Sequence, residues 1–273
     1  MNAEYSCASR RAADSTVGKD VRVSDVDGLE ANPWDDVPLL EVVVLHPKDA
    51  AAATDGGADR LLLVAEPGDV GIAPDLATVS AVVKATDLPV RVMLRQGEGF
   101  EVTPAGVDAL AEFAEASQAL GARGFSFGFL DHLLEIDGEA CSELASRVRL
   151  PWTFHRGFDS TLNPRRAWRD VVNLPGLDAV ASAGSSRGMS AGADELLEHA
   201  TNPRVAAVLL AGGALQPEQV PWLVRAGVRQ FGVGASVRPG RSWTRSFVDL
   251  HHVRTWRMLL DDAVARARGL PVD

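Results

Sequence analysis

The 273-residue sequence has few cysteines and no long apolar stretch. Its two cysteines, Cys7 and Cys141, match neither the number nor the spacing of a disulfide framework or a thiolate metal site. No apolar run approaches the roughly 20 residues that a membrane-spanning helix needs, and the N-terminal segment lacks the apolar core of a signal peptide. We therefore expect a cytoplasmic protein without a membrane partner.

Positive charge is also scarce, because 27 Lys and Arg residues stand against 37 Asp and Glu, for a formal net charge of −10. Binding to nucleic acid requires a basic surface, so we expect no nucleic acid partner. Lysine is confined to Lys19, Lys48 and Lys84, and the 27 basic residues less these three leave 24 arginines. Since arginine is the default cation of this chain, an arginine at a given position is weak evidence for a chemical role.

The hydrophobic pattern divides the chain into two parts. Residues 1–37 are rich in Ala, Ser, Asp and Arg and lack periodicity, which predicts a mobile or loosely docked N-terminal tail. Residues 38–273 alternate short apolar runs with amphipathic stretches. The predicted strands span residues 39–45, 60–65, 90–94, 124–129, 152–155, 179–182, 205–211 and 229–233. The predicted helices span residues 47–55, 103–120, 138–147, 191–199, 217–226 and 247–268, and two more begin at Pro74 and near Asn163.

This strict alternation predicts the α/β class, with parallel strands joined by right-handed crossovers. Eight strand–helix pairs close a single (β/α)8 TIM barrel, and no insertion is long enough for a second domain. An open, doubly wound sheet is the alternative. It is disfavoured because no G-x-G-x-x-G motif follows the first predicted strand.

In such barrels, active sites form where the strands end and the loops to the helices begin. The segment 153–159 (TFHRGFD) places His155, Arg156 and Asp159 at the end of the fifth strand. Histidine can transfer protons near neutral pH, and arginine can hold a carboxylate or phosphate through two parallel bonds. Asp159 would orient either of them. The alternative is an Arg156–Asp159 salt bridge at the rim beside a purely structural His155.

Glycine-rich loops follow the seventh and eighth predicted strands. Gly212, Gly213 and Gly234 in these loops are candidates for binding phosphate through backbone N–H groups. The alternative is that glycine merely permits tight turns. The arginines expected around the same mouth are Arg95, Arg156, Arg187 and Arg238. Together these features predict a site for a small anionic molecule.

Glu41 lies within a predicted strand of leucines and valines. A buried carboxylate needs a partner or a raised pKa, so Glu41 is either a general acid or base or a member of a structural ion pair with an arginine. His46, His132 and His155 are conceivable ligands of zinc or another divalent metal, together with Asp131 or Asp159. No short-spaced motif such as H-x-H or H-E-x-x-H supports that arrangement, so we predict no metal site and no certain cofactor.

Several segments carry motifs that allow comparison with a known family. Residues 39–64 combine a Leu-Glu strand, a helix and a Gly-Ala-Asp-Arg entry to the second strand, and the third strand ends at Arg95. Gly128 and Leu130 form a Gly-x-Leu motif, TFHRGFD is one letter from Thr-Phe-His-Arg-Ala-Phe-Asp, and the seventh strand ends in Ala-Gly-Gly. In these features, residues 39–234 resemble the CutC family. The resemblance implies a (β/α)8 fold, a cytoplasmic protein, copper homeostasis and copper ion binding. The family-site residues that it identifies here are Glu41, Arg95, His155, Arg156 and Asp159.

The sequence departs from the family pattern at positions that matter for copper. Where cysteines are common in the family, this chain has Val43, Val44 and Val64. Copper(I) prefers soft sulfur ligands, so these positions offer it none. A glutamate usual in the second strand is Leu62 here, and a histidine usual near the eighth strand aligns with Gly232.

Three functions therefore stay open. The first is copper handling, as the resemblance implies. The second is an enzyme of the lyase or isomerase type that uses acid/base chemistry on a small anionic or phosphorylated metabolite, without a Schiff base because no lysine ends a predicted strand. The third is a non-catalytic binding or scaffold protein. Barrels of this kind often pair, so a homodimer is also considered.

Overall fold

The computed structural model describes residues 37–67, 70–97 and 99–270. The N-terminal tail predicted over residues 1–37 lies outside the described residues, apart from Val37. Cys7 lies outside them as well.

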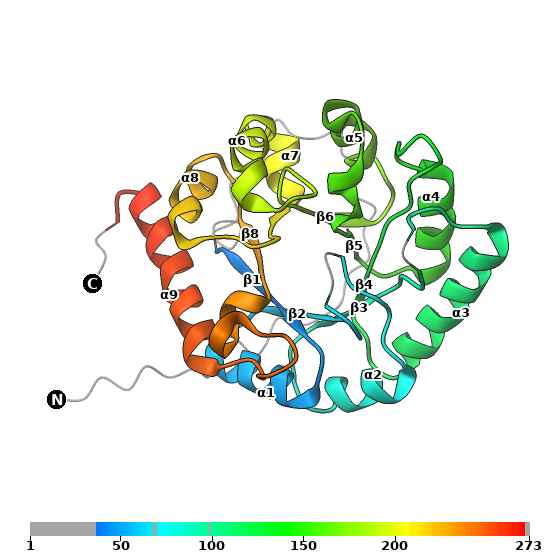
Figure 1. Ribbon diagram of the computed structural model, residues 1–273, viewed down its shortest axis with the longest axis horizontal. Coiled ribbons are helices and arrows are strands. Elements are labelled where there is room, and N and C mark those ends of the chain that lie inside the picture. Colours follow the sequence, from blue (N-terminus) through cyan, green and yellow to red (C-terminus); the bar gives the residue numbers. More distant parts are fainter. Residues whose placement is uncertain (1–36, 68–69, 98, 271–273) are drawn as a thin grey trace, which may run out of the picture. The chain divides into compact units, whose positions relative to one another are not determined.

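Eight parallel strands form one closed barrel in the order of the sequence (Figure 1). The strands are β1 (Leu39–Val44), β2 (Arg60–Leu63), β3 (Val90–Met93), β4 (Gly124–Phe127), β5 (Trp152–Phe154), β6 (Leu177–Ser182), β7 (Leu209–Ala211) and β8 (Gln230–Val233). Because β1 pairs with both β2 and β8, the sheet has no free edge. The predicted (β/α)8 TIM barrel is confirmed, and the open sheet is excluded.

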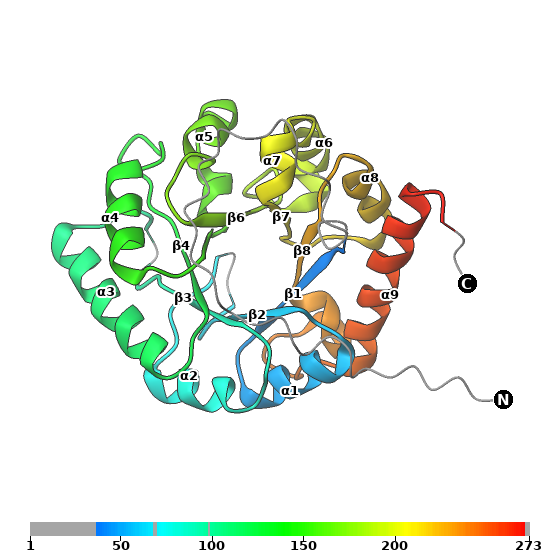
Figure 2. The ribbon, with the colours of Figure 1, turned by 180° about the vertical axis from the view of Figure 1, so that it is seen from behind.

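The α-helices surround the barrel, as both opposite views show (Figures 1 and 2). They are α1 (Pro47–Gly56), α2 (Leu76–Val83), α3 (Pro104–Ala119), α4 (Gly138–Val148), α5 (Pro164–Val171), α6 (Met189–Ala200), α7 (Pro203–Val208), α8 (Val220–Arg225) and α9 (Leu250–Ala267). Local capping fixes several starts. Thr103, for example, accepts a hydrogen bond from the Gly106 N–H (3.1 Å) in front of Pro104. Among the described residues, no helix is both long and apolar enough to cross a bilayer.

One predicted element is wrong in part. Residues 205–211 were predicted as a strand, whereas α7 occupies Pro203–Val208 and only Leu209–Ala211 form β7. The side chain of Asn202 accepts from the Arg204 N–H (3.0 Å), and Pro203 stands at the first helical position. These helix-start signals override the apolar run, whose period does not distinguish a buried strand from a short helix.

The alternation of side chains along β1 explains how the barrel builds both a core and an interior site. Leu40, Val42 and Val44 are fully buried in the hydrophobic core, which also includes Ala50 and Ala53 of α1. The alternate residues Glu41 and Val43 instead line a cavity inside the barrel. The strand therefore contributes Glu41 and Val43 to the candidate site.

A buried ion pair ties the first and last units of the barrel together. Arg238 follows β8 and pairs with Asp49 of α1 at 2.8 Å, with both side chains 1% exposed. Asp49 also accepts from the N–H groups of Leu45 (3.0 Å) and Val248 (2.8 Å). Arg238 donates as well to the carbonyl of Ser246 (2.9 Å). The loop after β8 is thus anchored to the start of α1.

Candidate functional site

A cavity of about 610 Å³ lies at the carboxyl ends of the strands and extends into the barrel. Its rim includes residues that directly follow strands, such as Val64 after β2, His155 after β5, Gly212 after β7 and Gly234 after β8. Its floor includes Glu41 of β1 and residues of the neighbouring strands. This is the position at which enzymes with this fold carry their active sites.

His155 lines the cavity as a neutral ring. It is 3% exposed, and its Nδ1 accepts a hydrogen bond from the Gly157 N–H (3.1 Å). Burial lowers the pKa of its imidazole to about 3. Because Nδ1 is an acceptor, the proton of the neutral ring is on Nε2, which can donate to a ligand. The sequence suggested that His155 titrates near neutral pH, but burial lowers its pKa well below that range.

Arg156 lines the cavity and is held from behind by Asp159. Its Nε donates to Asp159 Oδ2 (3.0 Å), and its Nη2 donates to the carbonyl of Ser185 (3.3 Å). Asp159 also accepts from the Ser182 hydroxyl (2.6 Å) and the Ala183 N–H (3.0 Å), and its side chain is 1% exposed. Burial raises the pKa of this carboxyl. Asp159 itself does not line the cavity, so its role here is to position Arg156.

The glycines of the two predicted loops all line the cavity. Gly213 has φ +78°, and a Cβ at this position would lie 2.5 Å from Cζ and Nε of Arg156. Only glycine lets the guanidinium lie against this turn. A Cβ on Gly234 would overlap the ring of Trp243, which also lines the cavity. Close packing of the rim therefore requires glycine at both positions.

The arginines at the mouth differ in part from those predicted. Arg156 and Arg187 line the cavity as expected, and Arg241 lines it as well. Arg238 is instead buried against Asp49, because the 3₁₀ turn at Ala235–Val237 brings it towards α1.

Arg95 does not line the cavity. Its Nη1 donates to the Gly71 carbonyl (3.2 Å), and its guanidinium lies 5.2 Å from the centre of the Phe100 ring. Phe100 in turn lies 5.8 Å from the ring of His155. The positive charge of Arg95 adds to burial in lowering the pKa of His155.

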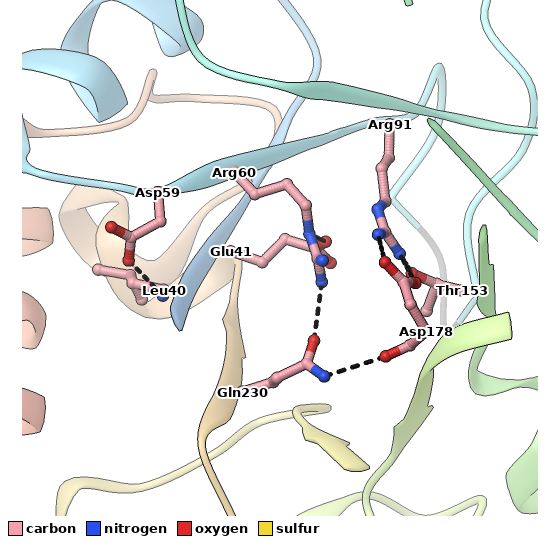
Figure 3. A network of polar contacts seen from close by, with 8 residues as sticks. All are labelled: Leu40, Glu41, Asp59, Arg60, Arg91, Thr153, Asp178 and Gln230. Carbon is pink, nitrogen blue, oxygen red and sulfur yellow. Dashed lines mark hydrogen bonds and ion pairs between the residues drawn. The ribbon is translucent and has the colours of Figure 1, made fainter. Parts of the chain in front are cut away.

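The floor of the cavity joins a polar network inside the barrel (Figure 3). Glu41 accepts from Arg60 Nε at 2.6 Å, and both side chains are buried. Arg60 also contacts Gln230 (3.3 Å), whose amide donates to the carbonyl of Asp178 (3.1 Å). The ion pair that was one of the two readings of Glu41 is thus present, although Glu41 still lines the cavity.

A second ion pair completes this network. Arg91 of β3 binds the carboxylate of Asp178, and its Nη1 also donates to the hydroxyl of Thr153. Thr153 and Ser126 line the floor, and sequence reasoning missed both. The inward positions of β4 and β5 were a signal for them, since these alternate with the buried Phe125, Phe127 and Phe154.

The histidines that were considered for a metal do not converge. His46 caps α1 by accepting from the Lys48 N–H (3.1 Å), and its ring packs 5.1 Å from that of Phe247. His132 is exposed in the loop after β4. Within residues 37–67, 70–97 and 99–270, no group of three or more His, Cys, Asp or Glu side chains could hold a metal ion.

The buried cysteine of α4 is a packing residue. Cys141 is fully buried, and its Sγ accepts from the Phe129 N–H (3.4 Å). Burial raises the pKa of its thiol to about 12, so it is not ionised at neutral pH. A protonated thiol is a poor metal ligand.

Comparison with known proteins assigns the chain to a family. The CutC family model matches residues 38–236. A human protein named copper homeostasis protein cutC homolog is 30% identical over 177 residues, which cover 64% of this chain but less than two thirds (63%) of the human one. A family protein CutC from Sodalis glossinidius is 28% identical over 200 residues, covering 71% of this chain and 77% of that protein. The crystal structure of a CutC protein from Streptococcus agalactiae superposes with a TM-score of 0.63 at 21% identity, covering 72% of this chain and 98% of that one. The chain belongs to the CutC family.

Proposed function

We propose that the protein binds a small anionic molecule, in particular one with a phosphoryl group, at the mouth of its barrel. The observation that carries this proposal is the convergence of Arg156, Arg187 and Arg241 with the Gly213 and Gly234 turns on one cavity. Such a cluster in a chain of net charge −10 makes a local positive site.

The geometry of Arg156 favours an anion over a neutral ligand. Asp159 and the Ser185 carbonyl hold its guanidinium at the cavity wall, so little side-chain freedom is lost on binding. Gly213 removes the side chain that would otherwise separate the guanidinium from the turn after β7. The loops after the seventh and eighth strands are the usual phosphate site of this fold.

His155 at the rim and Glu41 at the floor of the cavity suit an enzyme of the isomerase or lyase type. The neutral His155 would donate from Nε2 to an oxygen that gains negative charge in the reaction, as a pre-organised donor. Glu41 would supply the carboxylate for proton transfer from the other side of the barrel. The proposed chemistry uses no Schiff base, since Lys48 and Lys84, the lysines of the part of the chain that the structure describes, lie at helices and not at strand ends.

Copper homeostasis is the second candidate, and it is favoured by the name of the human relative. The donors in the cavity do not fit direct copper(I) binding. Val43 and Val64 line the wall where the resemblance would place cysteines, and Met93 contributes the sulfur found among the described lining residues. Copper(I) sites use soft thiolate or thioether ligands. We therefore propose that any role in copper homeostasis runs through the anionic ligand.

Calorimetric titration of inorganic phosphate into the full chain tests the main proposal. Arg156→Gln should weaken binding by about 10- to 100-fold, because a charge-assisted hydrogen bond is lost. Arg225→Gln is the matched control, since Arg225 stacks on Trp222 of α8 and does not line the cavity. Equal effects of the two variants, or no binding by the wild type, would refute the proposal.

A competition titration with a chromogenic copper(I) chelator tests the second candidate. The protein should carry Cys7→Ala and Cys141→Ala, so that incidental thiols do not contribute. We expect no competition for the metal. Tight one-to-one binding by this variant would show a copper site built without thiols and would restore the direct role.

A further inference from the structure

The floor of the cavity contains a buried hydroxyl group that finds no hydrogen-bond partner among the described residues. It is the Oγ of Ser126, a residue of β4 that is 1% exposed. The residue lines the cavity. Burying a hydroxyl without a hydrogen bond costs free energy, so native proteins seldom leave one unsatisfied. A ligand group that reaches the floor would supply the missing partner.

Two other groups that line the cavity can bind the same ligand. Glu41 uses Oε2 in its pair with Arg60, and a carboxylate can also accept at its second oxygen. The Thr153 hydroxyl accepts from Arg91, which leaves its own O–H as a donor. The three side chains come from β1, β4 and β5 and meet at the same cavity.

The charge balance of the floor determines which chemical group it suits. The negative charge of Glu41 is compensated by Arg60, and that of Asp178 by Arg91 (Figure 3). A net-neutral floor gives no advantage to a ligand ammonium or carboxylate. Paired donors and acceptors without net charge are complementary to ligand hydroxyl groups, which both donate and accept.

The depth of the cavity sets the length of the ligand. Glu41 is level with Gly232 in the register of β1 and β8, and Gly234 lies two residues further along. At a rise of about 3.3 Å per residue, the floor lies roughly 7 Å below the rim. Because bonds of about 1.5 Å advance an extended chain by only about 1.3 Å each, a chain of roughly five carbons together with its phosphate ester, about six bonds in all, spans this distance.

We propose that the ligand is a phosphorylated polyol or open-chain sugar of about five carbons, with its phosphate at the arginines of the rim and its far hydroxyl groups at Ser126, Thr153 and Glu41. This inference rests on the proposed anion site and adds the chemical class of the rest of the ligand. The apolar walls formed by Leu62, Met93 and Leu210 contact the carbon chain.

Calorimetry with three kinds of probe separates the two parts of the ligand. Inorganic phosphate tests the rim alone, n-pentyl phosphate adds a chain without hydroxyl groups, and the 5-phosphates of ribitol, arabinitol and xylitol, each tested singly, add the hydroxyl groups. At least one pentitol phosphate should bind tenfold or more tightly than n-pentyl phosphate, because a polar site rejects an analogue that lacks the matching hydroxyl groups.

Ser126→Ala is the decisive variant. Removing a hydroxyl that has no partner should leave the fold intact or slightly more stable, so the variant remains testable. It should weaken the binding of the preferred pentitol phosphate by about three- to tenfold and leave the affinities for inorganic phosphate and n-pentyl phosphate unchanged.

The outcomes distinguish this inference from the proposal on which it rests. The polyol inference is overturned, while the anion site stands, in either of two cases. All phosphates bind but no pentitol phosphate binds more tightly than n-pentyl phosphate, or Ser126→Ala leaves the affinity for the pentitol phosphate unchanged. If no probe binds, the anion site itself fails.

Discussion

The most direct test of the site is the substitution Gly213→Ala, because one added methyl group affects both the backbone of the turn after β7 and the position of Arg156. Gly213 has φ +78°, which costs an L-residue roughly 1–2 kcal/mol. Its Cβ would also lie 2.5 Å from Cζ and Nε of Arg156, so the guanidinium must move away from the turn. We expect the melting temperature to fall by about 2–8 °C from the backbone cost alone. Displacement of Arg156 should weaken the binding of inorganic phosphate, measured by calorimetry, by about 10- to 100-fold.

Gly227→Ala separates the two effects. Gly227 has φ +92°, and its Cβ would meet only Ala206 at an ordinary 3.4 Å, in the turn between α8 and β8. This variant should show a similar loss of thermal stability with unchanged phosphate affinity. If Gly213→Ala binds phosphate like the wild type, or if Gly227→Ala weakens binding as much, then Arg156 does not hold the anion and the reasoning is refuted.

Three further predictions concern buried charges. Asp49→Ala should lower the free energy of unfolding in urea by about 3–5 kcal/mol, because it leaves Arg238 buried without its carboxylate; adding Arg238→Met should recover part of this loss, and no recovery would contradict the account. The folded pKa of His155 is about 3 against an ordinary 6.5, so the unfolded state binds the proton more readily. The free energy of unfolding should therefore fall as the pH falls from 6.5 towards 3, by at most about 1.4 kcal/mol per pH unit. Nitrogen NMR should show a neutral Nε2–H ring at pH 5, and a protonated ring would disprove this prediction. The pKa of Asp159 is raised above its ordinary 3.8, so the folded state binds the proton of this carboxyl more tightly than the unfolded state does. The free energy of unfolding in urea should therefore fall as the pH rises from 3.8 through the folded pKa, and Asp159→Asn should not show this decrease.

The fold was readable from the sequence because its signals are local and repeat along the chain. Thr103 and Pro104 define the start of α3, and the alternating apolar runs define the strands within a few residues. The seventh unit was misread because its short apolar run fits either period, and the deciding signal was the Asn202–Pro203 helix start.

The candidate site was harder to read, because its chemistry depends on contacts between distant parts of the chain. The sequence placed His155, Arg156 and the three loop glycines at one rim, and all of them line the cavity. It could not show that Arg238 forms an ion pair with Asp49, 189 positions away, or that Arg241 lines the mouth instead. Burial likewise decides the protonation of His155, and burial is a property of the assembled barrel.

The lining of the cavity is the basis for our proposal that this member of the CutC family does not bind copper(I) directly. A copper(I) site would need soft donors on the wall, where Val43 and Val64 instead present apolar surface. The polar groups that remain lower in the cavity are oxygens, from Glu41, Ser126 and Thr153. Oxygen donors bind copper(I) poorly but match the hydroxyl groups of a polyol. The features common to the family motif, His155 and Arg156, are those that would bind and polarise an anionic substrate. The proposed anion site therefore uses residues of the family motif that this chain retains.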